Sequence, residues 1–152
     1  MEETTSDRLL LPLPSSALRD YSLHGHLAVE ALLCHEGNAH LVYHLVQVLH
    51  LSYFLQTIGY DALPVSTYRQ ADLALDHVAR RGVSVGAWRI DADDVDHVTP
   101  ILRLHDRQMS VAPLFAVMEA KRRLVRFAES GNRCPWPNSA PPTDTLDGLS
   151  NC

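Results

Sequence analysis

The sequence predicts an all-α protein, a compact bundle of about five helices built on an antiparallel helical hairpin. Apolar residues recur at the three- and four-residue spacing of helices, and Ser, Asn and Gly stand where helices begin and end. With 46% hydrophobic and 20% charged residues, the 152-residue chain has the composition of one globular domain. We therefore expect a single helical domain over residues 22–131.

The hairpin is expected to contain two helices, Ser22 to Glu36 and Ala39 to Ile58. Ser22 is a favourable N-cap, Gly37 is a typical left-handed helix stop, and Asn38 can cap the next helix. Gly59 then ends the second helix. Because the turn between them is so short, the two helices should be antiparallel neighbours.

Three more helices are expected after the hairpin. They are predicted from Ser66 to Arg81, from Asp91 to about Arg107 with Pro100 inside or near its start, and from Ser110 to Gly131. Residues 83–90 alternate weakly between apolar and polar, but a lone strand would lack a partner. We interpret them as a connecting loop that follows a helix stop at Gly82.

Both ends of the chain are expected to lie outside this domain. Residues 1–21 are acidic and then bear Pro and Ser, which favours an extended or partly ordered lead-in. Residues 132–152 hold four prolines among small polar residues and are predicted to be a disordered tail.

The charge pattern argues against a protein that works mainly by neutralising phosphates. The formal net charge is -5, and no Lys or Arg occurs between Arg19 and Arg69. We therefore do not expect a nucleic-acid partner. That stretch instead holds six of the nine histidines, whose charge depends on pH: His24, His26, His35, His40, His44 and His50.

Nothing in the sequence predicts export or a membrane partner. The N-terminus is acidic and unlike a signal peptide, and the longest apolar segment, Ala39 to Ile58, contains three histidines. The three cysteines form neither a disulfide framework nor a zinc motif, which favours a reducing compartment. A cytoplasmic location is the resulting prediction.

His40 and His44 form the best candidate metal site. Four residues apart on one helix, they can point two imidazoles at one divalent ion. Glu30, Cys34 or His35 could supply a third ligand from the neighbouring helix. Because two ligands do not make a site, packing at a helix interface or dimer contact remains open, and otherwise no cofactor is expected.

The second helix also carries a candidate partner-binding face. Tyr43, Gln47, His50 and Phe54 lie opposite its apolar core face, and they are too aromatic for an ordinary solvated surface. Interface cores favour few charges and many aromatics. We expect this face to bind a second copy of the chain, and protonation of its histidines to weaken the resulting homodimer or higher oligomer.

Arg122, Arg123 and Arg126 form a second candidate partner-binding cluster. Guanidinium groups one helical turn apart can bind phosphate or an acidic protein surface. The nearby Glu119 and Glu129 indicate the alternative, a solvated helix face with local ion pairs.

Two short segments resemble known functional motifs. Residues 77–89 are similar to the turn of helix-turn-helix DNA-binding proteins, but Gly86 and the aspartates that follow oppose DNA contact. His105 and Asp106 resemble the adjacent metal ligands of metal-dependent phosphohydrolases, but the other ligands of that pattern are missing. We interpret this pair as a solvated helix end. With no nucleophile elbow or phosphate-binding loop, we predict no catalytic residues.

The hairpin also resembles short uncharacterised bacterial proteins labelled as Fis-type transcriptional regulators. The likeness spans residues 22–60 and rests on the stretches 22–33, 37–38 and 53–60. It implies regulation of transcription, although the matching residues lie outside any expected DNA-reading element.

The sequence therefore leaves three hypotheses. The first is a non-enzymatic interaction or regulatory protein that self-associates through the hairpin. The second is a metal-binding protein that uses His40 and His44. The third is a DNA-binding regulator that uses the Gly82 region or the last helix.

Overall fold

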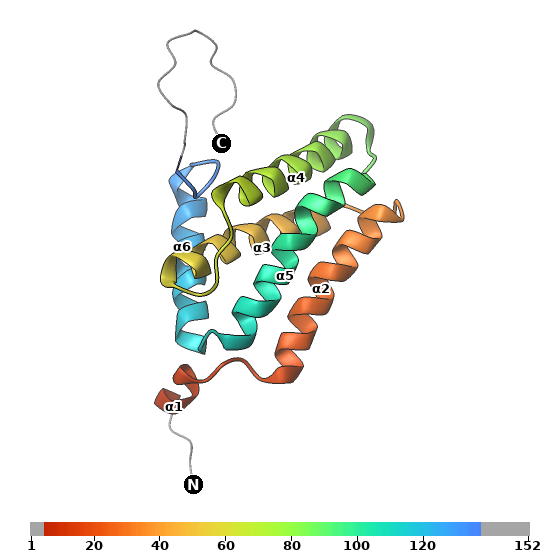
Figure 1. Cartoon of the computed structure of the whole chain (residues 1–152). Helices are drawn as coiled ribbons and strands as arrows, with labels where there is room; N and C mark the ends of the chain where they lie inside the picture. The colour runs from red at the N-terminus through yellow and green to blue at the C-terminus, as the bar shows by residue number, and fades with distance from the viewer. Residues whose placement is uncertain (1–4, 138–152) are drawn as a thin grey trace, which may run out of the picture.

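A computed structural model describes residues 5–137 as six α-helices, with no strand among them (Figure 1). The predicted all-α class is confirmed. The helices are α1 (Thr5–Leu10), α2 (Ser15–Leu33), α3 (Ala39–Ile58), α4 (Val65–Val85), α5 (Ala92–Val111) and α6 (Leu114–Ser130).

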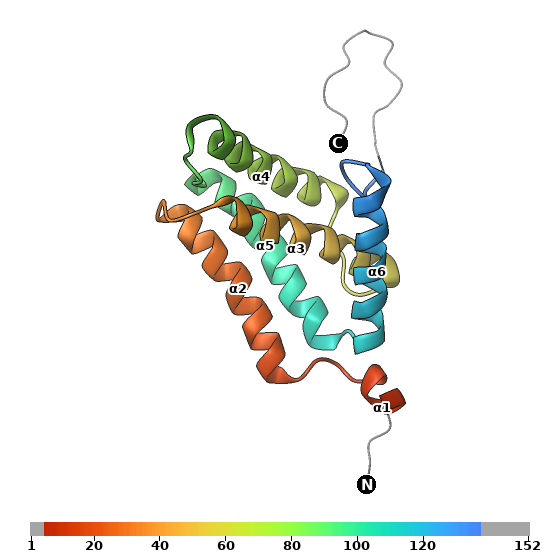
Figure 2. The same ribbon diagram turned by 180° about the vertical axis from the view of Figure 1, so that it is seen from behind.

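Helix α3 is the centre of the arrangement. It packs against α2, α4, α5 and α6, whereas α6 packs mainly on α3 and α1. Figures 1 and 2 show α6 at one edge of the bundle and α2 at the opposite edge. The two ends of α3 therefore meet different neighbours.

The hairpin forms, but its first helix is longer at its start than predicted. Helix α2 begins at Ser15, so Ser22 lies inside it rather than capping it, and the helix ends at Leu33. The bounds of α3 are confirmed: the Asn38 side chain accepts a hydrogen bond from the Leu41 amide at 3.0 Å, and Gly59 is left-handed with φ 118°.

The predicted helix stop at Gly82 is wrong. Helix α4 continues to Val85 and ends at Gly86, whose φ is 71°. Gly82 is instead required for space, because a Cβ there would lie 2.2 Å from the Trp88 ring. Of the predicted loop 83–90, the first three residues are helical, and no second helix follows Gly82 directly. The turn of a helix-turn-helix motif is therefore not formed.

The last two helices also differ from their predicted bounds. Helix α5 passes through Pro100 and reaches Val111, and α6 begins at Leu114 after Pro113 rather than at Ser110. Proline has no N–H but fits the first turn of a helix, which explains the position of Pro113. Gly131 ends α6 as predicted, with φ 74°.

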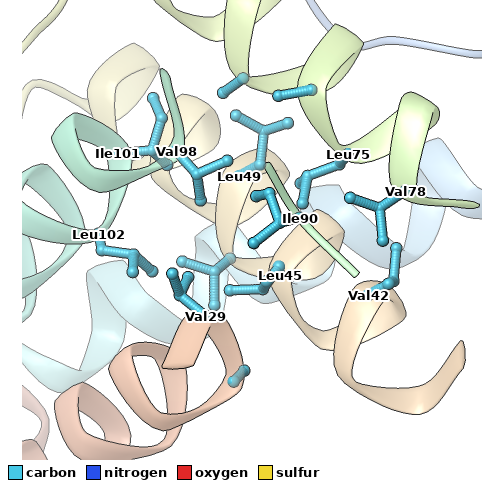
Figure 3. Packing of buried hydrophobic residues seen from close by; sticks show 14 of the residues in the cluster. Val29, Val42, Leu45, Leu49, Leu75, Val78, Ile90, Val98, Ile101 and Leu102 are labelled. Carbon is cyan, nitrogen blue, oxygen red and sulfur yellow. The ribbon is translucent and has the colours of Figure 1, made fainter. Parts of the chain in front are cut away.

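The core lies between α2, α3, α4 and α5 (Figure 3). Figure 3 shows side chains from these helices meeting around Leu45 and Leu49 of α3. Burying such side chains contributes about 1.5–3 kcal/mol each. A smaller apolar cluster, with Leu55 and Ala116 buried in it, joins the C-terminal half of α3 to α6.

The predicted start of the disordered tail at residue 132 is wrong. Trp136 is only 3% exposed and packs against Tyr53, Tyr68 and His50. Burial of the Trp136 side chain therefore holds this Pro-rich segment against the helices, because an indole buries much apolar area. The remaining predicted tail, residues 138–152, lies outside the described residues, as do residues 1–4.

Two cysteines have different states. Cys34 is an exposed free thiol, whereas Cys134 is disulfide-bonded. The sequence pattern suggested no disulfide framework, and the bond at Cys134 was not expected.

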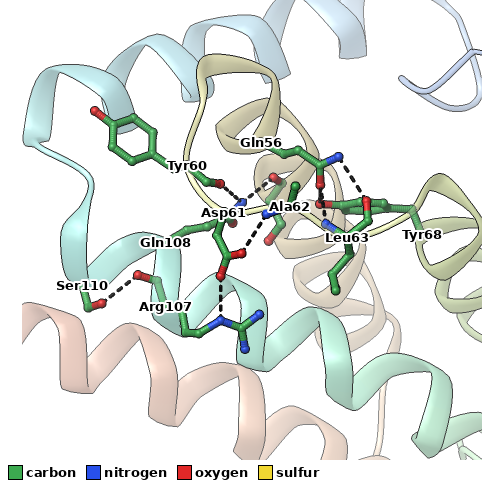
Figure 4. A network of polar contacts seen from close by, with 10 residues as sticks. Gln56, Tyr60, Asp61, Ala62, Leu63, Tyr68, Arg107, Gln108 and Ser110 are labelled. Atoms are coloured by element: carbon green, nitrogen blue, oxygen red, sulfur yellow. Dashed lines mark hydrogen bonds and ion pairs between the residues drawn. The ribbon is translucent and has the colours of Figure 1, made fainter.

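A polar network fastens the α3–α4 loop to α5 (Figure 4). Arg107 donates to the Asp61 carboxylate at 2.7 Å, and the buried Gln108 side chain donates to the carbonyls of Ser52 and Tyr60 at 3.0 and 2.9 Å. The pKa of Asp61 is lowered, chiefly by the hydrogen bond from Arg107. Gln108 thus provides a donor to the Tyr60 carbonyl, which lies just beyond the end of α3, and joins the loop to the body of that helix through Ser52.

Within residues 5–137, no helix combines the length and the apolar character needed to cross a membrane.

Candidate functional site

The predicted partner face of α3 is divided in two by the fold. Tyr43, in the N-terminal half, is 61% exposed and accepts a hydrogen bond from Gln47 at 3.1 Å. His50 and Phe54, in the C-terminal half, contact Phe127 of α6, with ring centroids 5.0 and 6.1 Å apart. The prediction that His50 binds another molecule is therefore wrong, because α6 of the same chain buries it, whereas Phe54 is half-buried and its partner role stays a prediction.

The arginine cluster is also partly used within the chain. Arg122 and Arg123 pair with Glu119, and Arg123 also donates to the Thr57 hydroxyl at 3.2 Å. These bonds lower the pKa of Glu119, the largest cause being the hydrogen bond from Arg123. Arg126 is exposed. The ion pairs fit the predicted solvated face better than a preformed anion site.

Tertiary structure brings together four histidines that sequence spacing does not connect. We call this group the histidine seam, and it runs where α2, α3 and α5 meet. Its members are His24, His26, His44, Ser52, His105 and Asp106.

On the α2–α3 side of the seam, the rings of His24 and His44 stack with centroids 4.2 Å apart. Burial lowers the pKa of His44, and the nearby His24 and His40 lower it further. His44 Nε2 is buried without a hydrogen-bond partner in the described chain. A proton on His44 is therefore disfavoured, because it would place a charge in a partly buried site beside the imidazoles of His24 and His40.

On the α2–α5 side, His26 Nε2 donates to Asp106 Oδ2 at 2.9 Å. The neighbouring His105 is buried, and its Nδ1 lies 3.2 Å from the Ser52 hydroxyl of α3. Burial lowers the pKa of His105 to about 4 even though Asp106 acts to raise it. The interpretation of His105 and Asp106 as a solvated helix end is therefore wrong: His105 is a neutral core group within α5.

Beside the seam, a groove opens between α2 and α3. Its volume is about 450 Å³. We call it the hairpin groove, and it is lined by Asp20, Leu23, His24, Leu27, Ala28, Ala31 and Leu41. Leu23 and Leu27 are 53% and 55% exposed. Two large apolar side chains one turn apart on an open helix face are typical of a binding surface.

The candidate metal ligands His40 and His44 lie at the N-terminal end of α3, with His40 exposed. Within residues 5–137, no three His, Cys, Asp or Glu side chains are grouped so that they could hold a metal ion. His44 faces His24 through a ring stack, which is not how two ligands meet on one ion. The metal site stays a prediction, and the described structure gives it no third ligand.

No protein-family model, curated protein or solved structure matches this chain. The resemblance of residues 22–60 to Fis-type regulators stays a prediction.

Sequence reasoning missed both the histidine seam and the hairpin groove. The start of α2 at Ser15, before Ser22, was not expected, and no local pattern indicated that Leu23 and Leu27 face outward. One signal was available: His26, Ser52, His105 and Asp106 are polar residues on helical segments with apolar neighbours, where a buried polar group needs a partner.

Proposed function

We propose that this protein is a non-enzymatic interaction protein that forms a homodimer through the hairpin groove. The observation that supports this most is the open apolar wall of α2, where Leu23 and Leu27 are each more than half exposed. Burying both side chains in a partner would contribute several kcal/mol by the usual figure of about 25 cal/mol per Å².

A second copy suits this surface because of its charge and its shape. The sequence has no Lys or Arg between Arg19 and Arg69, so two hairpins can meet without burying a basic side chain. Leu23 and Leu27 form the α2 wall of the groove and are more than half exposed. In a two-fold dimer the same apolar wall of each copy can pack against that of the other.

The histidines beside the groove make the proposed dimer sensitive to pH. His24 lines the groove with Asp20 and stacks on His44, and His40 lies near His44. Burial and the two neighbouring imidazoles lower the pKa of His44, so its protonation, which would place positive charge beside the contact, requires acid below the ordinary imidazole range. We expect the dimer to weaken as the pH falls below that range.

Native mass spectrometry of the untagged protein, purified without chelators, tests the proposal. The Leu27→Asp variant should be monomeric where the wild-type chain is dimeric. Val83→Asp is the matched control, because Val83 is 81% exposed on α4 and lies outside the groove. A monomeric wild-type chain, or a dimer that survives Leu27→Asp, would reject the hairpin groove as the interface.

The same spectra report on the metal hypothesis. A stoichiometric metal adduct that is lost when His40 and His44 are both changed to Ala would support a metal-binding protein. The cytoplasmic location stays a prediction.

A further inference from the structure

A small pocket lies between α2 and α5, separate from the hairpin groove. Its volume is about 190 Å³, room for roughly six water molecules at about 30 Å³ each. Polar walls come from Arg19, Tyr21 and Ser22 of α2 and from His105 and Asp106 of α5. The pocket is the size of a small molecule rather than of a peptide.

The base of the pocket presents a hydrogen-bond donor. His105 is 4% exposed, and its Nδ1 lies 3.2 Å from the hydroxyl of the fully buried Ser52. We assign the hydroxyl as the donor to Nδ1, because no other acceptor for it is found among the described residues, and this assignment places the imidazole proton on Nε2. His105 Nε2 has no partner in residues 5–137 and is not sealed from solvent. It can therefore donate into the pocket.

Further donors line the α2 side. The Tyr21 hydroxyl accepts a hydrogen bond from Lys121 Nζ at 3.1 Å, which leaves its own hydrogen available. Arg19 lines the pocket and makes no ion pair within residues 5–137. One cationic side chain, Arg19, and the neutral groups Tyr21 and His105 thus line one small space, and Lys121 lies at its edge through the Tyr21 hydroxyl, an arrangement that favours an anion on the α2 side.

Asp106 is an acidic side chain of the lining, so the charge differs between the two sides of the pocket. Its Oδ2 is occupied by His26 Nε2 at 2.9 Å, on the α5 side. A ligand carboxylate would be repelled there and attracted toward Arg19 and Lys121. The apolar side chains of Leu18 and Met109 supply the rest of the lining.

From these groups we propose that the pocket binds a small organic monocarboxylate. Its carboxylate accepts hydrogen bonds from Arg19, Tyr21 and His105, and its short apolar part packs on Leu18 and Met109. This proposal does not depend on dimer formation, because none of these residues lines the hairpin groove.

The experiment is a titration of the full-length protein followed by the ring nitrogens of His105 in long-range proton–nitrogen NMR spectra. The probes are formate, acetate, butanoate and 4-methylpentanoate, with 4-methylpentanamide and 3-methylbutylamine as the neutral and cationic controls. We expect saturable shifts of His105 Nε2 with the carboxylates only, and tighter binding as the apolar part grows.

Arg19→Gln should weaken carboxylate binding by about tenfold, the effect of losing one charge-assisted hydrogen bond. Arg80→Gln, an exposed arginine of α4 that pairs with Asp76, is the matched control and should bind as the wild type does. Leu27→Asp should also bind normally, which separates this site from the dimer interface.

Three outcomes would overturn the proposal. The first is that no carboxylate shifts His105 up to the millimolar range. The second is that the amide or the amine binds as well as 4-methylpentanoate. The third is that Arg19→Gln and Arg80→Gln bind the carboxylates equally.

Discussion

The two halves of α3 carry similar residues and have different surroundings. The C-terminal half places His50 and Phe54 under Phe127 of α6 and beside Trp136. The N-terminal half leaves Tyr43 exposed and borders the open hairpin groove. A face that combines His with aromatic residues is thus core where a helix crosses it and surface where none does. Composition along α3 does not distinguish these two cases.

The largest expected effect on stability is in the C-terminal half of α3, which α6 and Trp136 cover. Replacing Trp136 with Ala should lower the free energy of unfolding by about 3–5 kcal/mol, because it empties a space lined by Tyr53, Tyr68 and His50. Urea denaturation measures this change. Tyr43→Ala, in the exposed N-terminal half of α3, should lower the free energy of unfolding by no more than about 0.5 kcal/mol. Equal losses in the two variants would remove the distinction between the halves.

Acid should lower the free energy of unfolding through two buried histidines, His50 in the C-terminal half of α3 and His105 in the histidine seam. Burial lowers the pKa of His50 and of His105 to about 4, below the ordinary value of 6.5. Between these values the unfolded chain binds more protons, so stability is lost as the pH falls from about 6.5 toward about 4, by up to about 3 kcal/mol per histidine.

Urea midpoints measured across this pH window test the expectation. His50→Leu should remove about half of the loss, because one of the two buried imidazoles is then gone. An unchanged pH profile in this variant would show that His50 is not kept neutral by α6.

The two buried histidines should differ when each is replaced by Leu at neutral pH. His105→Leu deprives the fully buried Ser52 hydroxyl of its acceptor and should cost about 1–3 kcal/mol. His50 Nε2 has no partner within the described residues, so His50→Leu should be neutral or stabilising. Thermal or urea unfolding measures both, and Ser52→Ala combined with His105→Leu should recover part of the loss.

The smallest effect on stability is expected in the exposed N-terminal half of α3. Tyr43→Phe removes the exposed hydrogen bond from Gln47 and should change the free energy of unfolding by about 0.5 kcal/mol or less. A loss well above this in urea denaturation would show that Tyr43 is covered in solution, although it lies outside the hairpin groove.

Much of the fold could be predicted from local signals. Asn38 and Gly59 set the ends of α3, because a side-chain cap and a left-handed glycine act on adjacent backbone groups. Gly82 misled the prediction for the opposite reason: its missing side chain makes room for Trp88, six residues later in the chain and outside the helix. A glycine has the same appearance in sequence whether it is needed for its φ or for its size.

The candidate site was less accessible to sequence reasoning. His40 and His44 attracted attention because their helical spacing is visible in the sequence, whereas His26 and Asp106 are 80 residues apart and meet at 2.9 Å. The helical pattern can show that a buried histidine needs a partner, but it cannot show which residue on another helix provides it.

By itself, the sequence determined the all-α class, the bounds of α3 and the shortage of basic charge along the hairpin, since caps, helical periodicity and composition are local properties. Only the tertiary structure decided that α6 and Trp136 cover one half of α3, that the other half borders an open groove, and that His105 is buried against Ser52. These outcomes depend on which helices cross one another, and crossing is set by contacts between residues far apart in the chain.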